Sequence, residues 1–314
     1  MGNAGLLPTL NRYTHQSLRP PLVPVQLTPD SPTIWCKLEF LSASGSTKDR
    51  IANYILEKAW RRGEVGPGAA VVEASSGSTS IAMALACAQM GLRFVAVMPE
   101  GVSNERSLMI RSYGGEVVFC PKADGIRGAC AAERVARERS AFQPRQFANP
   151  DNAAAHRTHT ALEIVAQVPG GVVDAVVSGV GTGGTLVGLY HGLRDSGCRV
   201  TPFAARPVVG TSLTEVECSS FSSRIPGVVE GISQLYRKEE LEGLQEIDVD
   251  DGQAIAVTRQ LIRKGFPVGP SSGLNYTAAL HVARMVGARA QIVTVFPDRM
   301  ERYFSTELFQ GWRE

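Results

Sequence analysis

Short apolar runs and amphipathic runs alternate along this chain, and the loops between them are rich in glycine and hydroxyl residues. Strands are predicted at 34–40, 70–73, 93–98 and 116–120, and helices at 49–62, from 75 to about 90, and at 105–113. In the first helix the apolar residues fall at helical spacing, at Ile51, Tyr54, Ile55 and Ala59. Strands that alternate with helices indicate βαβ units and a parallel sheet.

The same pattern returns in the second half of the chain. Strands are predicted at 173–178, 200–204 and 291–296, and helices at 186–193, 252–264 and 272–286. A length of 314 residues suits one large α/β domain or two smaller lobes. The polar stretch 143–152 is the best candidate for a crossing between lobes, and the irregular, proline-containing residues 1–20 are expected to form an arm.

The composition is that of a globular protein, with 44% apolar and 20% charged residues. A net charge of +2 gives no reason to expect nucleic acid or membrane partners. No run reaches membrane-spanning length and no export signal begins the chain, so a cytoplasmic location is expected. The scattered cysteines form no CxxC pair, which favours buried reduced thiols over disulfides or zinc ligands. They are Cys36, Cys87, Cys120, Cys130, Cys198 and Cys218.

Lys48 stands in the segment 44–50 (SGSTKDR), between a predicted strand and the start of a predicted helix. A cation is disfavoured at a helix N-terminus because the helix dipole is positive there. The position suits an amine that works as an uncharged Schiff base rather than as an ammonium. Lys48 is therefore a candidate catalytic residue.

The loop 179–185 (GVGTGGT) gives the strongest signal for phosphate binding. Glycines allow backbone N–H groups to approach an anion closely, the following helix adds its positive end, and Thr182 and Thr185 add hydroxyl donors. Two alternatives are a plain strand-to-helix turn and a dinucleotide fold, since the first glycines match part of that fingerprint. The dinucleotide fold lacks its acid at the end of the next strand, although Arg206 there could hold an NADP phosphate.

Two further loops open predicted helices with hydroxyl residues. Residues 75–79 (SSGST) would present free N–H groups and hydroxyls suited to a carboxylate, although an ordinary N-cap explains the serines equally well. Residues 270–273 (PSSG) precede another helix and also read as a capping sequence. His156 and His159 lie three apart, but no third ligand stands out, so a structural role is favoured over a metal site.

In combination, these loops resemble the motifs of the cysteine synthase (O-acetylserine sulfhydrylase) and cystathionine β-synthase family of fold-type-II pyridoxal phosphate enzymes. The matches cover nearly the whole chain and follow the family's order. They pair 21–23 (PLV) with TPLV, 44–50 with SGSVKDR, 73–79 with EATSGNT, 98–106 with MPxxMSxER, 146–150 with QFxNP, 181–185 with GTGGT, 269–273 with GISSG and 297–306 with PDxGERYLST.

The resemblance implies an α/β fold like that of the tryptophan synthase β-subunit, with two lobes that each hold a mostly parallel twisted sheet flanked by helices. It places a smaller mobile lobe, which carries the carboxylate-binding loop, at 41–149. A larger lobe that binds the cofactor phosphate is expected at 12–40 plus 150–314, and an N-terminal arm at 1–11. A homodimer is also implied.

The resemblance assigns pyridoxal 5′-phosphate as the cofactor and gives the site residues their roles. Lys48 would hold the cofactor covalently and later move the α-proton, and Ser271 would face the pyridine nitrogen. The cofactor-binding residues are Lys48, Ser78, Gly181, Thr182, Gly183, Gly184, Thr185 and Ser271. The substrate-binding residues are Ser75, Ser76, Gly77, Thr79, Gln146 and Gly227. No metal ligand is assigned.

The implied reaction is β-replacement. An activated L-serine, O-acetylserine first of all, loses its α-proton and its leaving group, and a small nucleophile adds to the resulting aminoacrylate. With sulfide as the nucleophile the product is L-cysteine. A neutral serine at the ring nitrogen favours prompt β-elimination over transamination, and closure of the smaller lobe over the carboxylate excludes water.

The chain departs from the family pattern in two places. Ser78 replaces the asparagine that contacts the ring hydroxyl of the cofactor, and because serine is shorter a water is expected to stand between them. The loop that begins at Gly227 reads GVVEG where sulfhydrylases commonly have GIGAG. Glu230 would therefore place a carboxylate at the substrate mouth, and Val228 and Val229 would narrow it.

Several alternatives remain open. O-phosphoserine or serine could be the donor, with thiosulfate, homocysteine or an amine as the nucleophile. Arg224 could serve an anionic donor, although a solvated arginine is favoured. A non-catalytic paralogue that binds a ligand or partner proteins comes next, and an NADP-binding oxidoreductase comes last.

Overall fold

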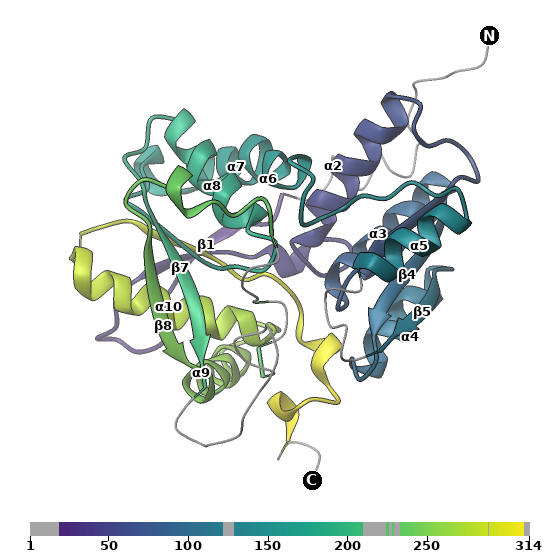
Figure 1. Ribbon diagram of the computed structural model, residues 1–314. Coiled ribbons are helices and arrows are strands. Elements are labelled where there is room, and N and C mark those ends of the chain that lie inside the picture. The colour runs from purple at the N-terminus through teal and green to yellow at the C-terminus, as the bar shows by residue number, and fades with distance from the viewer. Residues whose placement is uncertain are drawn as a thin grey trace.

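The computed structural model describes residues 19–121, 129–209, 224–225, 228, 233–287 and 289–310. These residues form two groups of elements, each built around its own β-sheet, and the C-terminal segment lies between the groups (Figure 1). The arm predicted at 1–11 lies outside the described residues. The lobe limits 41–149 and 12–40 with 150–314 stay predictions.

The smaller sheet has three parallel strands in the order β3-β4-β5. Its strands are β3 (Ala70–Ala74), β4 (Arg93–Pro99) and β5 (Glu116–Cys120). Its helices are α2 (Lys48–Arg61), α3 (Ser78–Met90), α4 (Asn104–Ser112) and α5 (Ala129–Glu138). Successive strand residues point to opposite faces, so Val71 belongs to the core shared with α2 and α3, while Val72 packs against α5.

The larger sheet has six strands in the order β1-β2-β9-β6-β7-β8. The pair β1 and β2 is antiparallel, and the other pairs are parallel. Its strands are β1 (Leu22–Val25), β2 (Ile34–Lys37), β6 (Ala175–Gly179), β7 (Thr201–Val208), β8 (Gln245–Asp250) and β9 (Ile292–Val295). The central parallel strands β6 and β9 are covered on both faces, as their near-continuous apolar runs require.

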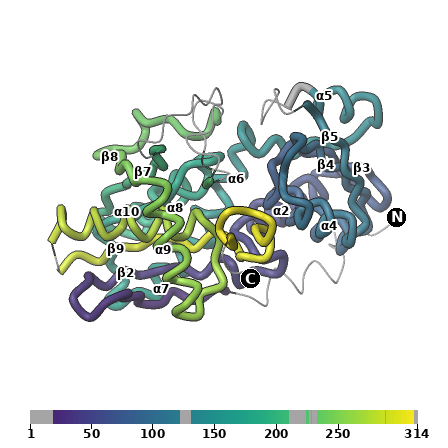
Figure 2. The backbone as a smooth tube through the Cα atoms, turned by 90° about the horizontal axis from the view of Figure 1, so that it is seen from below, coloured from purple at the N-terminus to yellow at the C-terminus, as the bar shows by residue number. Residues whose placement is uncertain are grey.

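Helices lie on both sides of the larger sheet. They are α6 (Asp151–Ala155), a π-helical segment (His156–Thr160), α7 (Ala161–Gln167), α8 (Gly184–Asp195), α9 (Asp251–Arg263) and α10 (Pro270–Val286). One core joins the sheet to α9 and α10, and a second core joins its other face to α7 and α8. Figure 2 shows α7 to α10 with this sheet in one group and α2, α4, α5 and the smaller sheet in the other.

The chain passes from the smaller sheet to the larger group through the predicted crossing. Phe142 still forms a bridge with Val71, and α6 begins at Asp151. Short 3-10 helices complete the described structure, at Glu39–Leu41, Pro169–Gly171, Lys238–Glu240, Met300–Tyr303 and Glu307–Phe309. Within the described residues, no helix combines the length and the apolar character needed to cross a bilayer.

The observed elements differ from the predicted ones at several ends. The strand predicted to reach residue 40 stops at Lys37, because a 3-10 turn starts at Glu39, whose carboxylate pairs with Arg50. The last helix begins at Pro270 rather than residue 272, since proline suits the first turn of a helix. The strands β1 and β8 and the helices α5 to α7 were not predicted as separate elements.

Candidate active site

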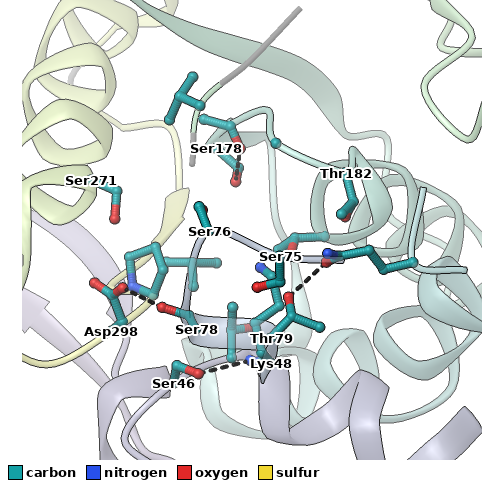
Figure 3. Close-up of a pocket in the computed structure, with 18 of the residues that line it drawn as sticks. Ser46, Lys48, Ser75, Ser76, Ser78, Thr79, Ser178, Thr182, Ser271 and Asp298 are labelled. Atoms are coloured by element: carbon teal, nitrogen blue, oxygen red, sulfur yellow. Dashed lines mark hydrogen bonds between the residues drawn. The ribbon is translucent and has the colours of Figure 1, made fainter. Parts of the chain in front are cut away.

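A pocket lies at the carboxyl ends of β3, β6 and β9, where α2, α3, α8 and α10 begin (Figure 3). Such strand ends are the usual ligand sites of parallel α/β sheets. The predicted residues that line it are Lys48, Ser75, Ser76, Ser78, Thr79, Gln146, Gly181, Thr182, Gly183, Thr185 and Ser271. Gly77 and Gly184 lie in the same loops without lining the pocket, and Gly227 lies outside the described residues.

Lys48 is the first residue of α2, and its side chain is partly buried in the pocket. Burial lowers the pKa of its amine below the usual value, Arg302 adds to this effect, and Asp298 opposes it. Its backbone N–H donates to Ser46 Oγ at 3.3 Å. The amine is therefore easier to deprotonate than a surface lysine, which suits a nucleophile or a base.

A buried charge cluster holds the start of α2 against the larger sheet. Arg50 pairs with Glu39 through two contacts of 2.7 Å and with Glu163 at 2.7 Å. Lys37, fully buried on β2, pairs with the same Glu163 at 2.7 Å. The four charges balance, so the cluster holds the turn that carries Lys48 without leaving an unpaired buried ion. Its members are far apart in sequence, so no local pattern predicts the cluster.

The glycine-rich loop 179–185 is held from behind by Asn152 of α6. The amide of Asn152 donates to Thr182 Oγ1 at 3.0 Å, and the Gly184 N–H donates to the same oxygen at 3.3 Å. A Cβ on Gly184 would overlap Asn152 Oδ1, so this close approach requires glycine. Because the Thr182 oxygen accepts two hydrogen bonds, its proton remains available for an anion.

His156 is fully buried beneath the same loop. Its Nε2 lies 3.2 Å from Thr185 Oγ1 and its Nδ1 lies 3.0 Å from Thr160 Oγ1. Burial, with Arg50 and Lys48 nearby, holds its pKa well below the usual value, so the ring is neutral. When Thr185 donates its proton to an anion, Nε2 of the ring is the donor to Thr185.

The polar residues behind the loop recur every four positions, at Asn152, His156 and Thr160. This spacing places them on one helical face, and it is the signal that could have predicted their role. The structural role expected for His156 agrees with these contacts. Among the described residues, no group of three histidine, cysteine or acidic side chains is placed to hold a metal ion.

The hydroxyl-rich loop 75–79 is tied to Gln146 of the crossing segment. Thr79 Oγ1 donates to Gln146 Oε1 at 2.6 Å, which is the dashed line at Thr79 in Figure 3. Gln146 Nε2 donates to the Ala74 carbonyl at 2.7 Å. Ser75 Oγ accepts from the N–H of Gly77 at 2.9 Å. The loop is thus folded on itself with the crossing segment beside it.

Glu73 supports this arrangement from the end of β3. Its carboxylate accepts from the N–H groups of Ala74 at 2.9 Å and Gln146 at 3.1 Å. Burial raises the pKa of Glu73 to about 7, and the hydrogen bonds from Gln146 and Ala74 limit the rise. A buried acid therefore sets the position of Gln146 relative to the loop.

Ser78 and Ser271 lie on the C-terminal side of the pocket. The hydroxyl of Ser78 donates to Asp298 Oδ2 at 3.0 Å and accepts from Arg302 Nη1 at 3.0 Å. The Oδ1 atom of Asp298 is buried and has no hydrogen-bond partner among the described residues. Ser271 lines the pocket in the first turn of α10, while Ser272 is fully buried. The contact of Ser78 with a cofactor stays a prediction, as do the other residue roles.

Two arginines considered from the sequence are bound elsewhere. Arg206 pairs with Glu246 and Asp248 of β8 at 2.8 Å each, which opposes its use for an NADP phosphate. Arg224 pairs with Asp251 at 2.9 Å and with Glu307, and it does not line the pocket. Arg224 is exposed to solvent, as favoured from the sequence, and two carboxylates also pair with it. Glu230 and Val229 lie outside the described residues, whereas Val228 lines the pocket.

These residues fit pyridoxal phosphate. The Thr182 proton and the start of α8 suit its phosphate, the Lys48 amine suits its aldehyde, and the neutral hydroxyl of Ser271 suits its ring nitrogen. Asp298 and Arg106 also line the pocket, and no role was predicted for either residue.

The family described as "Pyridoxal-phosphate dependent enzyme" matches residues 17–298. A cysteine synthase of Staphylococcus aureus (strain Mu50 / ATCC 700699) is 35% identical over 284 residues, 88% of this chain and 89% of that protein. An O-ureido-L-serine synthase of Streptomyces lavendulae is 34% identical over 309 residues, 97% of this chain and 94% of that protein.

A solved structure shows the same fold. An O-acetylserine-dependent cystathionine β-synthase from Helicobacter pylori superposes with a TM-score of 0.84 at 28% identity, covering 97% of this chain and 99% of that chain. The expected two sheets flanked by helices, and the expected pyridoxal phosphate cofactor, are confirmed. The protein is a cysteine synthase-like enzyme that acts on amino acids. The chain belongs to the fold-type-II pyridoxal-phosphate dependent enzymes, in the cysteine synthase and cystathionine β-synthase family.

Proposed function

We propose that this enzyme replaces the β-substituent of an activated L-serine, with O-acetylserine as the donor and sulfide as the nucleophile, to give L-cysteine. One observation carries the proposal: Lys48, the glycine-rich loop 179–185 and the hydroxyl-rich loop 75–79 line a single pocket. The similarity to a cysteine synthase along 88% of the chain supports the same reaction.

Each group of site residues would have a role that follows from its chemistry. Loop 75–79 and Gln146 would hold the substrate carboxylate and so point the Cα proton towards Lys48. When bound, pyridoxal phosphate supplies an aldehyde for an amine and a ring that withdraws electrons from Cα. The Lys48 amine, whose pKa burial lowers, would accept the Cα proton, and Ser271 would leave the ring nitrogen facing a neutral group.

The charges in the pocket favour an acetyl donor. Among the described residues that line it, only Lys48 and Arg106 are cationic, and Arg106 lies at the loop 75–79. A phosphorylated donor would bring a second phosphate without a cation to receive it, whereas acetate leaves as a weakly basic monoanion. The ion pairs of Arg224 remove the other candidate partner for such a donor.

A nucleophile other than sulfide is the second candidate. The chain is 34% identical to an O-ureido-L-serine synthase along 97% of its length, a longer match than the one with the cysteine synthase. Thiosulfate, homocysteine and amines belong to the same class of alternatives. In each case the donor half of the reaction stays the same.

Three coarser features are also proposed. Residues 41–149 would form a mobile lobe that closes loop 75–79 over the carboxylate, as the placement of this loop beside the smaller sheet supports. The enzyme would be a homodimer, as the family resemblance implies. It would act in the cytoplasm, and the buried free thiols of Cys36, Cys87 and Cys198 support a reducing compartment. Ligand-dependent proteolysis tests the closure of the lobe, and light scattering tests the homodimer.

A donor and nucleophile panel tests the function. Holoenzyme is incubated with O-acetylserine, O-phosphoserine or serine, each with sulfide, thiosulfate, homocysteine or an amine, and the amino acids formed are identified by mass spectrometry. We expect cysteine from O-acetylserine and sulfide, none from the Lys48→Ala variant, and a borohydride-reduced cofactor adduct on Lys48. An adduct on another lysine, or no product from O-acetylserine, would contradict the proposal.

A further inference from the structure

Arg106 is a buried arginine that lies against the substrate loop. Its side chain is 5% exposed, and it extends from α4 to the pocket. Within the described residues its guanidinium donates one hydrogen bond, from Nη1 to the Ser76 carbonyl at 2.8 Å. Its guanidinium also lies 5.1 Å from the centre of the Tyr303 ring. Arg106 is therefore fixed between the loop and the C-terminal segment.

Among the residues that the structure describes, the charge of Arg106 has no counter-ion. No aspartate or glutamate of the described residues forms an ion pair with it, and its Nε atom is buried without a partner. The partly buried Arg50 and the buried Arg302 differ in this respect: Arg50 pairs with Glu39 and Glu163, and Arg302 lies 3.8 Å from Asp298. A buried cation without an anion is costly, so a bound anion would stabilise it.

The N-terminus of helix α3, which is the positive end of its dipole, lies beside Arg106. Helix α3 begins at Ser78, and its N-cap residue is Gly77, which has no side chain; of the first-turn N–H groups, that of Ser80 donates to Ser75 Oγ at 3.3 Å. Gly77 has φ +152°, and a Cβ there would overlap Arg106 Cδ, so the arginine lies directly on the loop backbone. The helix dipole and the guanidinium thus both favour an anion at loop 75–79.

We propose that Arg106 is a positioning residue for the α-carboxylate of the substrate. It holds the Ser76–Gly77 peptide in the conformation that presents the loop, and its uncompensated charge strengthens carboxylate binding there. This inference rests on the proposed function, and it adds a specificity element: the enzyme selects amino acids with a free carboxylate over amides and amines of the same shape.

The test compares an acid with its amide. L-Alanine and L-alaninamide differ in the carboxylate and lack a β-leaving group, so binding of each to holoenzyme is read from its visible absorption without turnover. Arg106→Met should weaken L-alanine about 10- to 100-fold, the range for a hydrogen bond to a charged group, and leave L-alaninamide within about 3-fold. Arg106→Lys should recover part of the loss. In turnover, KM for O-acetylserine should rise more than kcat falls.

Arg111→Met on the exposed side of α4 is the matched control and should leave both affinities unchanged. Equal weakening of acid and amide in Arg106→Met, or weakening of neither, would overturn the role of Arg106. If Arg106→Met does not fold by circular dichroism, the acid-to-amide ratio of Arg106→Lys decides, and an unchanged ratio overturns the proposal. If wild-type holoenzyme responds to neither L-alanine nor O-acetylserine, the proposed function itself fails.

Discussion

The hydroxyl of Ser78 donates a hydrogen bond of 3.0 Å to Asp298 Oδ2, although 220 residues separate the two. The same carboxylate oxygen accepts from the hydroxyl of Tyr303 at 2.7 Å, and Arg302 Nη1 donates to Ser78 Oγ at 3.0 Å. This network joins the start of α3 to the C-terminal segment at the edge of the pocket. Ser78 therefore links two parts of the site in addition to any contact with the cofactor.

Loss of the Ser78 hydroxyl should destabilise the protein. In Ser78→Ala the Asp298 carboxylate loses a donor and Arg302 loses an acceptor, both in a buried setting, so the free energy of unfolding should fall by about 1–3 kcal/mol. Urea denaturation followed by circular dichroism measures this change. Ser112→Ala, which removes an exposed hydroxyl on α4, is the control and should change it by less than about 0.5 kcal/mol. Equal effects of the two variants would show that the network adds nothing.

Asn152→Ala should weaken cofactor binding. The variant removes the donor that holds Thr182 Oγ1, so the hydroxyl can turn away from the phosphate position. We expect the affinity of the apoenzyme for pyridoxal phosphate to fall about 10-fold, the value of one hydrogen bond, as measured by fluorescence titration. Thr158→Ala, an exposed change on the adjacent helical turn, should leave the affinity unchanged. If Asn152→Ala binds pyridoxal phosphate as tightly as the wild type, Asn152 does not support the phosphate site.

Glu163→Gln should reduce stability and alter its dependence on acid. Burial acts to raise the pKa of Glu163, but its bonds with Arg50 and Lys37 outweigh burial, and the net shift is downwards. A lowered folded pKa gives stability that is present above the unfolded value of about 4.3 and is lost as the pH falls through the folded pKa. The variant should lose about 3 kcal/mol near neutral pH and show a flatter acid decline.

Urea denaturation between about pH 7 and pH 3.5 measures both effects of Glu163→Gln. Glu138→Gln is the control, because Glu138 pairs with Arg134 at 3.7 Å on the exposed face of α5. Its unfolding free energy should change by less than about 1 kcal/mol. If the unfolding free energy of Glu163→Gln falls with pH as steeply as that of the wild type, the buried cluster is not the source of the acid sensitivity.

Glu73→Gln should change stability in the opposite pH direction. Burial raises the folded pKa of Glu73 to about 7 from the usual 4.5. A raised pKa gives stability that is complete below the unfolded value and is lost as the pH rises through the folded value. Between about pH 5 and pH 8 the wild type should lose up to roughly 3 kcal/mol relative to Glu73→Gln. Unfolding curves at both pH values test this, with the exposed Glu133→Gln as control. Parallel pH profiles of wild type and Glu73→Gln would show that Glu73 does not titrate in this range.

Much of the fold could be predicted from local patterns, and the exceptions have physical reasons. The edge strand β8 buries only Ile247 and Val249, so its apolar signal is weak. The strand β1 carries Pro24, which is tolerated because it lies on an edge, but which hides the strand from a propensity argument. The helices α6 and α7 are short and are joined by a π-helical segment, so neither shows a full helical period.

The candidate site was found through its loops, because glycine and hydroxyl residues at strand-to-helix turns have a direct physical meaning. Residues that act from behind the loops were missed. Asn152, Asp298 and Arg106 each lie on an element whose own pattern requires no polar side chain at that position. The ion pairs of Arg206 and Arg224 were also not predicted, because the fold brings their carboxylate partners from other parts of the chain.

By itself the sequence determined the alternation of strands and helices and the positions of the lysine, glycine-rich and hydroxyl-rich loops, because periodicity and turn chemistry act between neighbouring residues. Only the tertiary structure decided the pairs that complete the site: Thr79 with Gln146, Thr182 with Asn152, and Ser78 with Asp298. The reason is that a buried polar group must find a partner within hydrogen-bond distance, and the packing of the two sheets determines which residue that is.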